Sequence, residues 1–403
     1  MQLVEIHIKD DKQIEAMCIK AKSLYNQSLY YWRQSIFGNI QYFNEYELTG
    51  LFALHNEQSY KDLPAQTSQQ VIKLLFKNIK SWQQARKEYA KNPSKFLGRP
   101  KLPKYKKETS IVVFTSQQIK LKNGFIHFPK MTNLKPLKTK VSNVCQVRLI
   151  PQANTFKIEI VYEKEATNLK LEKENALAID LGLNNLVTAI DNVGNKPFII
   201  NGKILKSYNH WYNKKRAKLM SFIGGNGNSN KISKLTHYRN CYIEDKLHKA
   251  SRYIINYCIS NNIGIIAIGK NKQWKQSINI GKKNNQKFVE LPHAKLIDKI
   301  IYKANLVGIE VIINEESYTS KCDALALEPI KKHEIYLGKR KKRGLFQSSI
   351  GKLLNADVNG ATNIGRKSKV FCDDFVKRLT NSGCAFQPIR INFNKYLITS
   401  NVT

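Results

Sequence analysis

The sequence predicts an α/β domain with a mixed sheet, preceded by a region of helices and a small β-barrel. Three patterns predict this fold class. Apolar residues first repeat with a helical period, then alternate with polar residues between 110 and 163, and finally form short buried runs between helical stretches. A charged segment at 164–175 separates the last two patterns. We therefore place a domain boundary there.

The first predicted element is a strand at 2–8, which can join the barrel. A helix follows, and a second one runs from about 67 to 89 with Thr67 or Ser68 as its cap. The aromatic residues of the first helix either pack against a core or form a surface on which bases stack. They are Tyr25, Tyr30, Tyr31 and Trp32.

A basic, proline-containing segment at 92–108 ends the helical region, because proline does not fit a regular element there. It is either a solvated linker or an extended segment along a phosphate backbone, since its positive side chains are interleaved with aromatic ones. Its candidate nucleic-acid contacts are Arg99, Lys101, Lys104, Tyr105, Lys106 and Lys107.

The second half of the chain alternates strands and helices. Three buried strands are predicted first, and a long helical stretch at about 207–260 is broken by the loop GGNGNSN. A strand GIIAIG, a helix and a strand IEVIIN follow, and the last strand leads to Glu315 and Glu316. A final helix starts at about Asp357. This order predicts the mixed sheet.

The charge of the chain points to a polyanionic partner. The chain has 67 Lys and Arg against 30 Asp and Glu, a net charge of +37. Nucleic acid is the first candidate, and a membrane is a weaker one because no apolar run is long enough to span a bilayer. The first residues do not resemble a signal peptide, so we expect a cytoplasmic protein. Seven scattered cysteines include no CxxC pair.

Acidic residues at strand ends are candidate ligands for a divalent cation. Asp180 ends the strand ALAID, and Gly182 behind it relieves crowding. Carboxylates at neighbouring strand ends can hold Mg²⁺ or Mn²⁺ for phosphodiester hydrolysis. Each candidate has a structural alternative: Asp180 as a turn former and Asp357 as a helix N-cap. Asp191 and Asp298 look structural.

Several segments, taken in order, resemble the transposon-encoded TnpB family, RNA-guided nucleases related to the type V CRISPR effectors. The segments include IDLGLNNLVTAI at 179–190, DKLHKASRYII at 245–255, YTSK at 318–321 and NADVNGATNI at 355–364. The resemblance covers nearly the whole chain. It implies an RNase H-like (RuvC) nuclease domain at 169–370 and a wedge-like β-barrel at 1–14 and 106–168. It also implies a helical recognition region at 15–105 and a C-terminal tail at 371–403.

The family places one catalytic Asp on the first strand, a Glu on a later strand and an Asp near the last helix. Asp180 and Asp357 match the outer two, whereas the second position falls on Gly269, which cannot bind a metal. Either the site has lost cleavage, or Glu315 or Glu316 replaces the missing acid from the next strand. We favour Glu316; the alternative is that both acids begin a solvated loop.

Many relatives follow YTSK with two CxxC pairs that form a zinc ribbon. Here Cys322 has no cysteine partner, and Cys322 with His333 cannot complete a four-ligand site. We therefore expect a degenerate zinc-ribbon insertion at about 318–346 and no structural zinc. The run GKRKKRG at 338–344 is either a solvated loop or a contact that guides a nucleic-acid strand.

The resemblance implies an RNA-guided DNA endonuclease encoded by a transposon. It would cleave target double-stranded DNA by hydrolysis that depends on Mg²⁺ or Mn²⁺, as a monomer with its guide RNA, in a prokaryotic cytoplasm at the nucleoid. The alternatives are a nuclease-inactive RNA-guided DNA-binding protein and a transposase accessory protein without cleavage. Candidate readers of a short DNA motif are Gln69, Gln70 and Lys73, unless these form only an exposed helix face.

Overall fold

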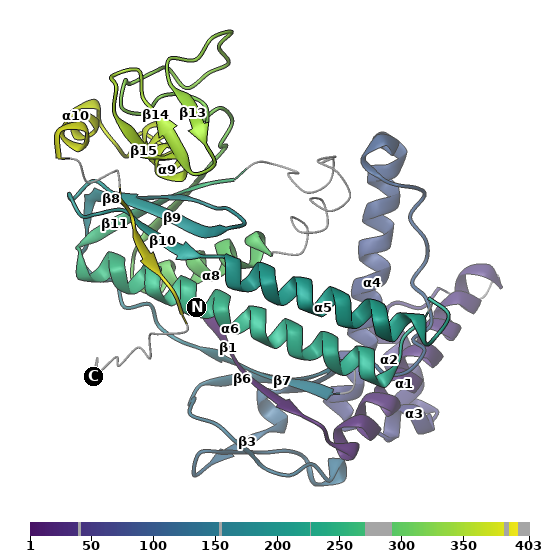
Figure 1. Cartoon of the computed structure of the whole chain (residues 1–403). Coiled ribbons are helices and arrows are strands. Elements are labelled where there is room, and N and C mark those ends of the chain that lie inside the picture. Colours follow the sequence, from purple (N-terminus) through teal and green to yellow (C-terminus); the bar gives the residue numbers. More distant parts are fainter. Residues whose placement is uncertain (39–41, 153–154, 226, 271–291, 383–386, 394–403) are drawn as a thin grey trace. The chain divides into compact units, whose positions relative to one another are not determined.

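The computed structural model describes residues 1–38, 42–152, 155–225, 227–270, 292–382 and 387–393. The chain divides into two compact units, Met1–Lys164 and Glu165–Thr403 (Figure 1). This division falls at the start of the charged segment 164–175, where the sequence predicts a boundary. Each unit is described by itself below.

The first unit contains a helical layer with a shared apolar core. Its helices are α1 (Lys12–Phe37), α2 (Glu45–Leu54), α3 (Gln58–Lys61) and α4 (Ala65–Lys91). Tyr25 and Trp32 of α1 are buried in this core together with Leu75 of α4. The packed interpretation of these two aromatic residues is therefore confirmed, whereas Tyr30 is 52% exposed. The sequence analysis missed α2 and α3.

The predicted cap of α4 is wrong. The helix starts at Ala65, with Pro64 at the N-cap position. Ser68 lies inside the first turns, where its buried hydroxyl donates to the carbonyl of Tyr60 at 2.7 Å. The hydroxyl therefore fastens the α3–α4 connection instead of satisfying free N–H groups of the helix.

The strands of the first unit form two antiparallel sheets. The larger has the order β1-β7-β6-β2, so the N-terminal strand joins it as predicted. Its strands are β1 (Gln2–Lys9), β2 (Val112–Thr115), β6 (Val144–Gln152) and β7 (Thr155–Glu163). The smaller consists of β3 (Lys120–Lys122), β4 (Phe125–His127) and β5 (Leu137–Lys138). In the described residues, strand pairing gives these two sheets and no single closed barrel.

The second unit is built on a mixed sheet, as the sequence predicts, with β16 as a sixth strand that was not predicted. The strand order is β12-β11-β8-β9-β10-β16. The strands are β8 (Glu172–Asp180), β9 (Asn185–Asp191), β10 (Phe198–Asn201), β11 (Ile263–Gly269), β12 (Glu310–Asn314) and β16 (Ile389–Ile391). Strands β8, β11 and β12 are parallel, whereas β9 is antiparallel to both of its neighbours. The carboxyl ends of the three parallel strands therefore lie at one edge.

Different helices cover the two faces of this sheet (Figure 1). On one face lie α5 (Lys203–Ser221), α6 (Asn230–Ser260) and α8 (His293–Asn305). On the other lie α9 (Ala356–Lys367), α10 (Asp373–Ser382) and a small sheet of β13 (Lys339–Lys342), β14 (Leu345–Gln347) and β15 (Leu353–Asn355). Strand β8 alternates Leu177 and Ile179 toward the first face with Ala176 and Ala178 toward the second. Small alanines leave room for α9.

The predicted C-terminal tail at 371–403 is wrong for its described part. Phe371, Phe375 and Val376 are buried in the core beside α9, and β16 pairs with β10 in parallel. Asp373 and Asp374 are exposed surface charges, as expected. The helix α10 was not predicted because these two charged residues stand at its start. Its apolar residues nevertheless repeat at three- and four-residue spacing.

Candidate functional site

The first acid of the candidate site stands at the carboxyl end of β8. Four buried residues precede Asp180, and the chain then turns through Gly182. A Cβ atom added to Gly360 of α9 would lie 2.7 Å from Oδ2 of Asp180. The helix therefore approaches the carboxylate closely because residue 360 has no side chain. Gly182 has another role than predicted, since its Cβ would lie 2.6 Å from the carbonyl oxygen of Asn185.

The second acid comes from the segment after β12. Gly269 ends β11 and is in register with Asn314, the last residue of β12. A Cβ atom on Gly269 would lie 3.0 Å from Oε2 of Glu316 and 2.5 Å from Cδ1 of Ile364. The Glu316 carboxylate therefore stands beside the end of β11, next to the place where a side chain at 269 would begin.

Glu315 points elsewhere. Its side chain is exposed and accepts a hydrogen bond from the hydroxyl of Ser317 at 2.7 Å. Glu316, by contrast, is partly buried and acts electrostatically on Asp180. The geometry thus supports Glu316 over Glu315, which is also the residue that the sequence favours because it directly precedes SYTSK.

The third acid, Asp357, lies in the first turn of α9. The N-cap is Asn355, whose side chain accepts from the N–H groups of Asp357 and Val358 at 3.0 and 3.3 Å. The interpretation of Asp357 as the N-cap is therefore wrong, and its carboxylate is available for other contacts. Asn185 donates to Oδ2 of Asp357 at 2.5 Å, and a guanidinium nitrogen of Arg340 lies 3.7 Å from Oδ1.

Asn185 and Arg340 were not singled out from the sequence. Asn185 follows a turn of the motif LGLNNL, where asparagine is common for local reasons. Arg340 is one of five consecutive basic residues in the sequence, and from the edge strand β13 its guanidinium forms an ion pair with Asp357. Only the tertiary fold separates these residues from their neighbours.

Glu316 and Asp357 act on Asp180 through their negative charges. Burial raises the pKa of Asp180 well above its usual range, and the negative charges of Glu316 and Asp357 raise it further. The N–H of Leu181 and the charge of Arg340 act in the opposite direction. Burial also raises the pKa of Glu316, to about 7. Such shifts arise where carboxylates are crowded without a sufficient positive charge between them.

The donor chemistry of this cluster suits a hard divalent cation. Carboxylate oxygens are the ligands that Mg²⁺ and Mn²⁺ prefer, and a cation would relieve the repulsion that raises the pKa of Asp180. Among the described residues, no three His, Cys, Asp or Glu side chains are grouped tightly enough to hold a metal ion as they stand. A cation would therefore have to draw the acids closer.

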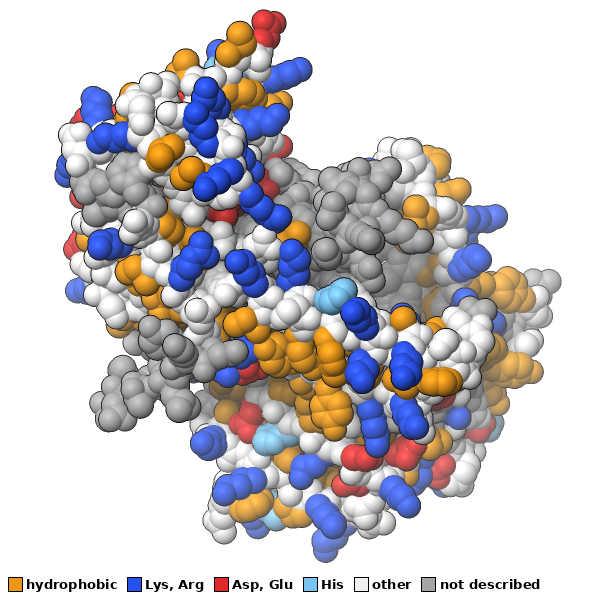
Figure 2. Space-filling view, viewed as in Figure 1, with side chains coloured by type: hydrophobic (Ala, Val, Ile, Leu, Met, Phe, Trp, Pro, Cys, Tyr) orange, Lys and Arg blue, Asp and Glu red, His pale blue; other side chains and the backbone are white. Residues whose placement is uncertain are grey.

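The predicted nucleic-acid contacts lie in the first unit and are mostly exposed. Gln69 and Lys73 project from α4 and Gln70 is partly buried. In the segment 92–108 the exposed candidates are Arg99, Lys101, Lys104, Tyr105 and Lys107, whereas Lys106 is partly buried. Figure 2 shows Lys and Arg side chains (blue) across the visible face, with far fewer acids.

The segment 92–108 is not a free linker. Trp82 and Arg33 donate to the carbonyls of Pro100 and Pro103 at 3.3 and 2.8 Å. The Arg33 guanidinium stacks over the Tyr105 ring at 4.7 Å. The Lys106 ammonium lies 5.0 Å from the centre of the Tyr25 ring, and burial lowers its pKa. Tyr105 and Lys106 therefore have structural contacts, whatever else they bind.

Two further predictions concern Asp191 and the possibility of a membrane-spanning helix. Asp191 is structural as expected, because its carboxylate accepts from three backbone N–H groups of the following turn and from the Tyr257 hydroxyl. Within the described ranges, no helix is both long and apolar enough to cross a bilayer.

Fold and site together define a basic α/β protein with a carboxylate cluster at its strand ends. Residues 159–275 match the family model OrfB_IS605, described as a probable transposase. Residues 293–364 match the model of the Cas12f1-like TNB domain. These two matches cover the strands β8 to β12 of the sheet and the segment that carries Glu316 and Asp357.

Known proteins agree with these matches. The CRISPR-associated endodeoxyribonuclease Cas12f1 of Sulfoacidibacillus thermotolerans is 25% identical over 223 residues, which cover 52% of this chain and 50% of that protein. The chain thus matches half the length of that relative. A cryo-EM structure of a Cas12f1-sgRNA-target DNA complex has a similar fold, with a TM-score of 0.51 and 16% identity over 88% of this chain and 81% of that one. The two family models and the Cas12f1 relative support a TnpB-like family for this chain, which agrees with the resemblance seen in the sequence.

Proposed function

We propose that the chain is an RNA-guided DNA endonuclease whose second unit is an RNase H-like (RuvC) nuclease domain. The observation that carries the proposal is the position of Glu316. Its carboxylate stands beside Gly269, where the family pattern expects an acid, and it interacts with Asp180. The family matches and the central strand order β12-β11-β8-β9-β10 support the same domain.

In this proposal Asp180, Glu316 and Asp357 hold the divalent cation, Mg²⁺ or Mn²⁺. When bound, the cation activates water and neutralises charge that develops on the phosphate. The chain's own residues prepare the cluster. Asn185 orients the Asp357 carboxylate from one side, and the exposed Arg340 is within reach of both Asp357 and a phosphate brought to the site.

The proposed partners are a guide RNA and target DNA. The positive charge of the chain supplies attraction to phosphate backbones without sequence preference, so base pairing with a guide would supply the choice of target. The Cas12f1 structure of similar fold was solved with both kinds of nucleic acid. A transposon origin, a monomeric state and a place at the nucleoid stay predictions.

The test is a cleavage assay on the protein purified with its RNA. We expect cleavage of matched DNA only with Mg²⁺ or Mn²⁺. Asp180→Asn and Glu316→Gln should each lower the rate at least about a hundredfold, because a metal ligand is lost. Glu315→Gln is the matched control and should cut like wild type.

Two outcomes would contradict the proposal in different ways. Normal cleavage by Glu316→Gln would show that another acid completes the site. If the wild type binds guide RNA and target DNA but cuts under none of these conditions, the chain is the nuclease-inactive binding protein instead.

A further inference from the structure

The segment that follows Glu316 contains little regular secondary structure, yet it has buried acidic side chains. Asp323 is 0% and Glu328 2% exposed. Two carboxylates removed from water are tolerated only where hydrogen bonds replace their hydration. Many members of the family that the sequence resembles have a zinc ribbon at this place, whereas hydrogen bonds hold the segment here.

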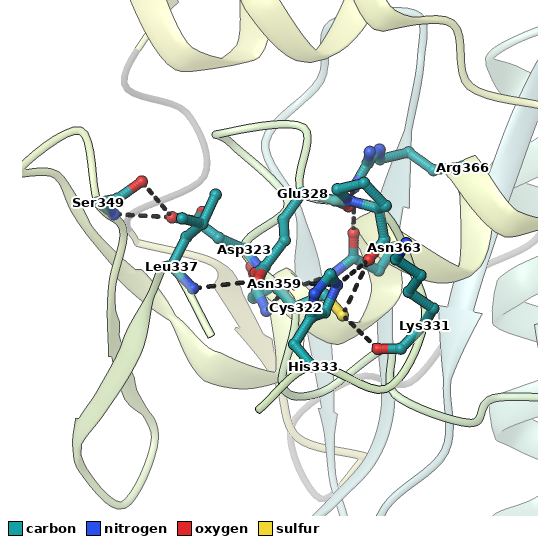
Figure 3. Close-up of polar contacts among 11 residues, drawn as sticks. Cys322, Asp323, Glu328, Lys331, His333, Leu337, Ser349, Asn359, Asn363 and Arg366 are labelled. Atoms are coloured by element: carbon teal, nitrogen blue, oxygen red, sulfur yellow. Dashed lines mark hydrogen bonds and ion pairs between the residues drawn. The ribbon is translucent and has the colours of Figure 1, made fainter. Parts of the chain in front are cut away.

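Each of the two carboxylates accepts hydrogen bonds from groups in or next to the same segment (Figure 3). Oδ2 of Asp323 accepts from the Ser348 hydroxyl and the Ser349 N–H, each at 2.7 Å, and from the Ser349 hydroxyl at 3.1 Å. Glu328 accepts from the N–H groups of Asp323 and Leu337 at 2.6 and 3.0 Å. The two acids therefore fasten the two ends of the insertion to each other.

Polar side chains of α9 hold the same segment from the other side. The buried Asn363 donates to the carbonyls of Thr319 and Cys322 at 2.9 and 2.7 Å. The buried Asn359 donates to Cys322 and accepts from the Ala324 N–H, at 2.9 and 3.0 Å. Arg366 donates to Asn363 and to the Glu328 carbonyl at 2.8 and 3.1 Å. Residues 359, 363 and 366 share the helix face toward the segment.

The residues present do not fit a structural zinc. Cys322 is the only cysteine of the insertion, and its Sγ lies 3.5 and 3.7 Å from the carbonyl oxygens of Pro329 and Lys331. Burial raises its pKa, which disfavours the thiolate that zinc requires. Nε2 of His333 donates to the Pro329 carbonyl at 2.7 Å.

The network reaches the candidate site through Thr319. The N–H and hydroxyl of Thr319 donate to the carbonyl of Glu316 at 3.3 and 2.8 Å. Asn363 donates to the carbonyl of Thr319, and Asn363 lies on α9, the helix that carries Asp357. A path of buried and partly buried hydrogen bonds thus joins the backbone of the second acid to the helix of the third.

We infer that Asn363, with Asn359, is a positioning residue that sets Glu316 against Asp357, and that this hydrogen-bond network replaces a structural zinc. The role in catalysis rests on the proposed nuclease function, whereas the role in holding the segment does not. Amide and carbonyl groups buried together have few alternative partners, so the geometry they fix is well defined.

The first experiment compares Asn363→Ala with Ser349→Ala, which removes one hydrogen bond at the far end of the same network. Amide hydrogen exchange is measured over residues 316–322, and cleavage is measured against Mg²⁺ concentration. We expect Asn363→Ala to speed exchange there and to raise the Mg²⁺ concentration for half-maximal cleavage about tenfold, as loss of a ligand-orienting contact does. Ser349→Ala should change neither.

Equal effects of the two variants would overturn the positioning role. Thr319→Val keeps the side-chain shape but removes the hydroxyl bond to Glu316, and it replaces Asn363→Ala if that variant does not fold. The exchange measurement does not depend on cleavage. If the wild type is inactive, the proposed function is refuted, but hydrogen exchange still tests whether Asn363 holds residues 316–322.

The second experiment tests the absence of zinc. Wild type purified in Mg²⁺-free buffer should contain zinc far below one equivalent by elemental analysis, and a chelator should leave its unfolding temperature unchanged. Stoichiometric zinc, or a fall in unfolding temperature when the chelator is added, would overturn the replacement of zinc by the network.

Discussion

Two glycines show how missing side chains shape the candidate site. Gly269 stands where the family pattern expects an acid, and in the structure Ile364 and Glu316 take the space that its side chain would need. Gly360 lets α9 approach the Asp180 carboxylate. In both places the absent Cβ atom determines where a neighbouring carboxylate can stand.

Gly360→Ala tests this role. Alanine in a helix interior is ordinarily about 1 kcal/mol more stable than glycine. Here the new Cβ would lie 2.7 Å from Oδ2 of Asp180, so the carboxylate must move. We expect cleavage at low Mg²⁺ to fall at least about tenfold, with little loss in the free energy of unfolding measured by denaturant titration.

Gly50→Ala is the matched control for Gly360→Ala, because a Cβ atom at Gly50 of α2 would meet nothing within 4 Å. It should stabilise the chain and leave the Mg²⁺ requirement unchanged. Unaltered cleavage by Gly360→Ala would show that the Asp180 carboxylate has freedom to move, contrary to the expected crowding.

The buried acids make the stability of the metal-free chain depend on pH. The pKa of Glu316 rises from 4.5 to about 7 on burial. A carboxyl group with a higher pKa in the folded chain favours folding while protonated, and this stability is lost as pH rises from about 4.5 through about 7. We expect the unfolding temperature without metal to fall as the pH rises across this range. Mg²⁺ should raise the unfolding temperature more at about pH 8 than at about pH 6, because cations bind ionised carboxylates.

Glu316→Gln should remove the part of this pH dependence that comes from Glu316 and weaken the Mg²⁺ response, while the raised pKa of the buried Asp180 keeps the remainder. Glu315→Gln should keep both because Glu315 is exposed. Equal stabilisation by Mg²⁺ at the two pH values would argue against metal binding by these acids.

At the scale of elements, the start of a helix determines which side chains reach the site. Asn355 caps α9 and thereby leaves the Asp357 carboxylate to Asn185 and Arg340. Asn44 caps α2 in the same way, by accepting from Tyr46 and Glu47. The two caps offer a comparison between similar local contacts in different surroundings.

Asn355→Ala and Asn44→Ala should each lower the free energy of unfolding by about 1 kcal/mol, the usual effect of losing an N-cap side chain. Only Asn355→Ala should raise the Mg²⁺ concentration needed for cleavage, because it frees the first turn that carries Asp357. Asn355→Ser should recover most of the loss. An equal effect of both alanine variants on the Mg²⁺ requirement would show that general destabilisation is responsible.

At the scale of the whole molecule, the net charge of +37 dominates the expected behaviour with nucleic acid. Binding that releases counterions from about six phosphates weakens roughly a thousandfold between about 50 mM and about 200 mM salt. We expect a steep salt dependence for RNA binding, measured by filter binding or fluorescence anisotropy.

Lys101→Gln and Lys106→Gln separate contact from packing in that measurement. Lys101 is exposed, so its loss should reduce the slope of log K against log salt by about one. Lys106 is partly buried beside Tyr25, so Lys106→Gln should lower stability and leave the slope nearly unchanged. A reduced slope for Lys106→Gln would give this residue the nucleic-acid contact predicted from the sequence.

Much of the fold follows from local pattern. The long helices α1, α4, α5 and α6 and the strands of the large sheets other than β16 lie where periodicity predicts them. The helices α2 and α3 were missed because they are short and their apolar residues mark no narrow face. The strand β16 has three residues, and only its pairing with β10 makes it a strand.

By itself the sequence determined the charge and the order of the main strands and helices. Its motifs also carry the resemblance to the TnpB family and the prediction of Asp180 and Asp357 with a missing partner between them. Periodicity and motif order are local properties, so the chain alone carries them. Only the tertiary structure decided that Glu316 stands beside Gly269, that Asn355 caps α9, and that Asn185 and Arg340 contact Asp357. Most of those contacts join residues that are far apart in the chain. These residues come close in space only when the sheet and α9 have folded against each other.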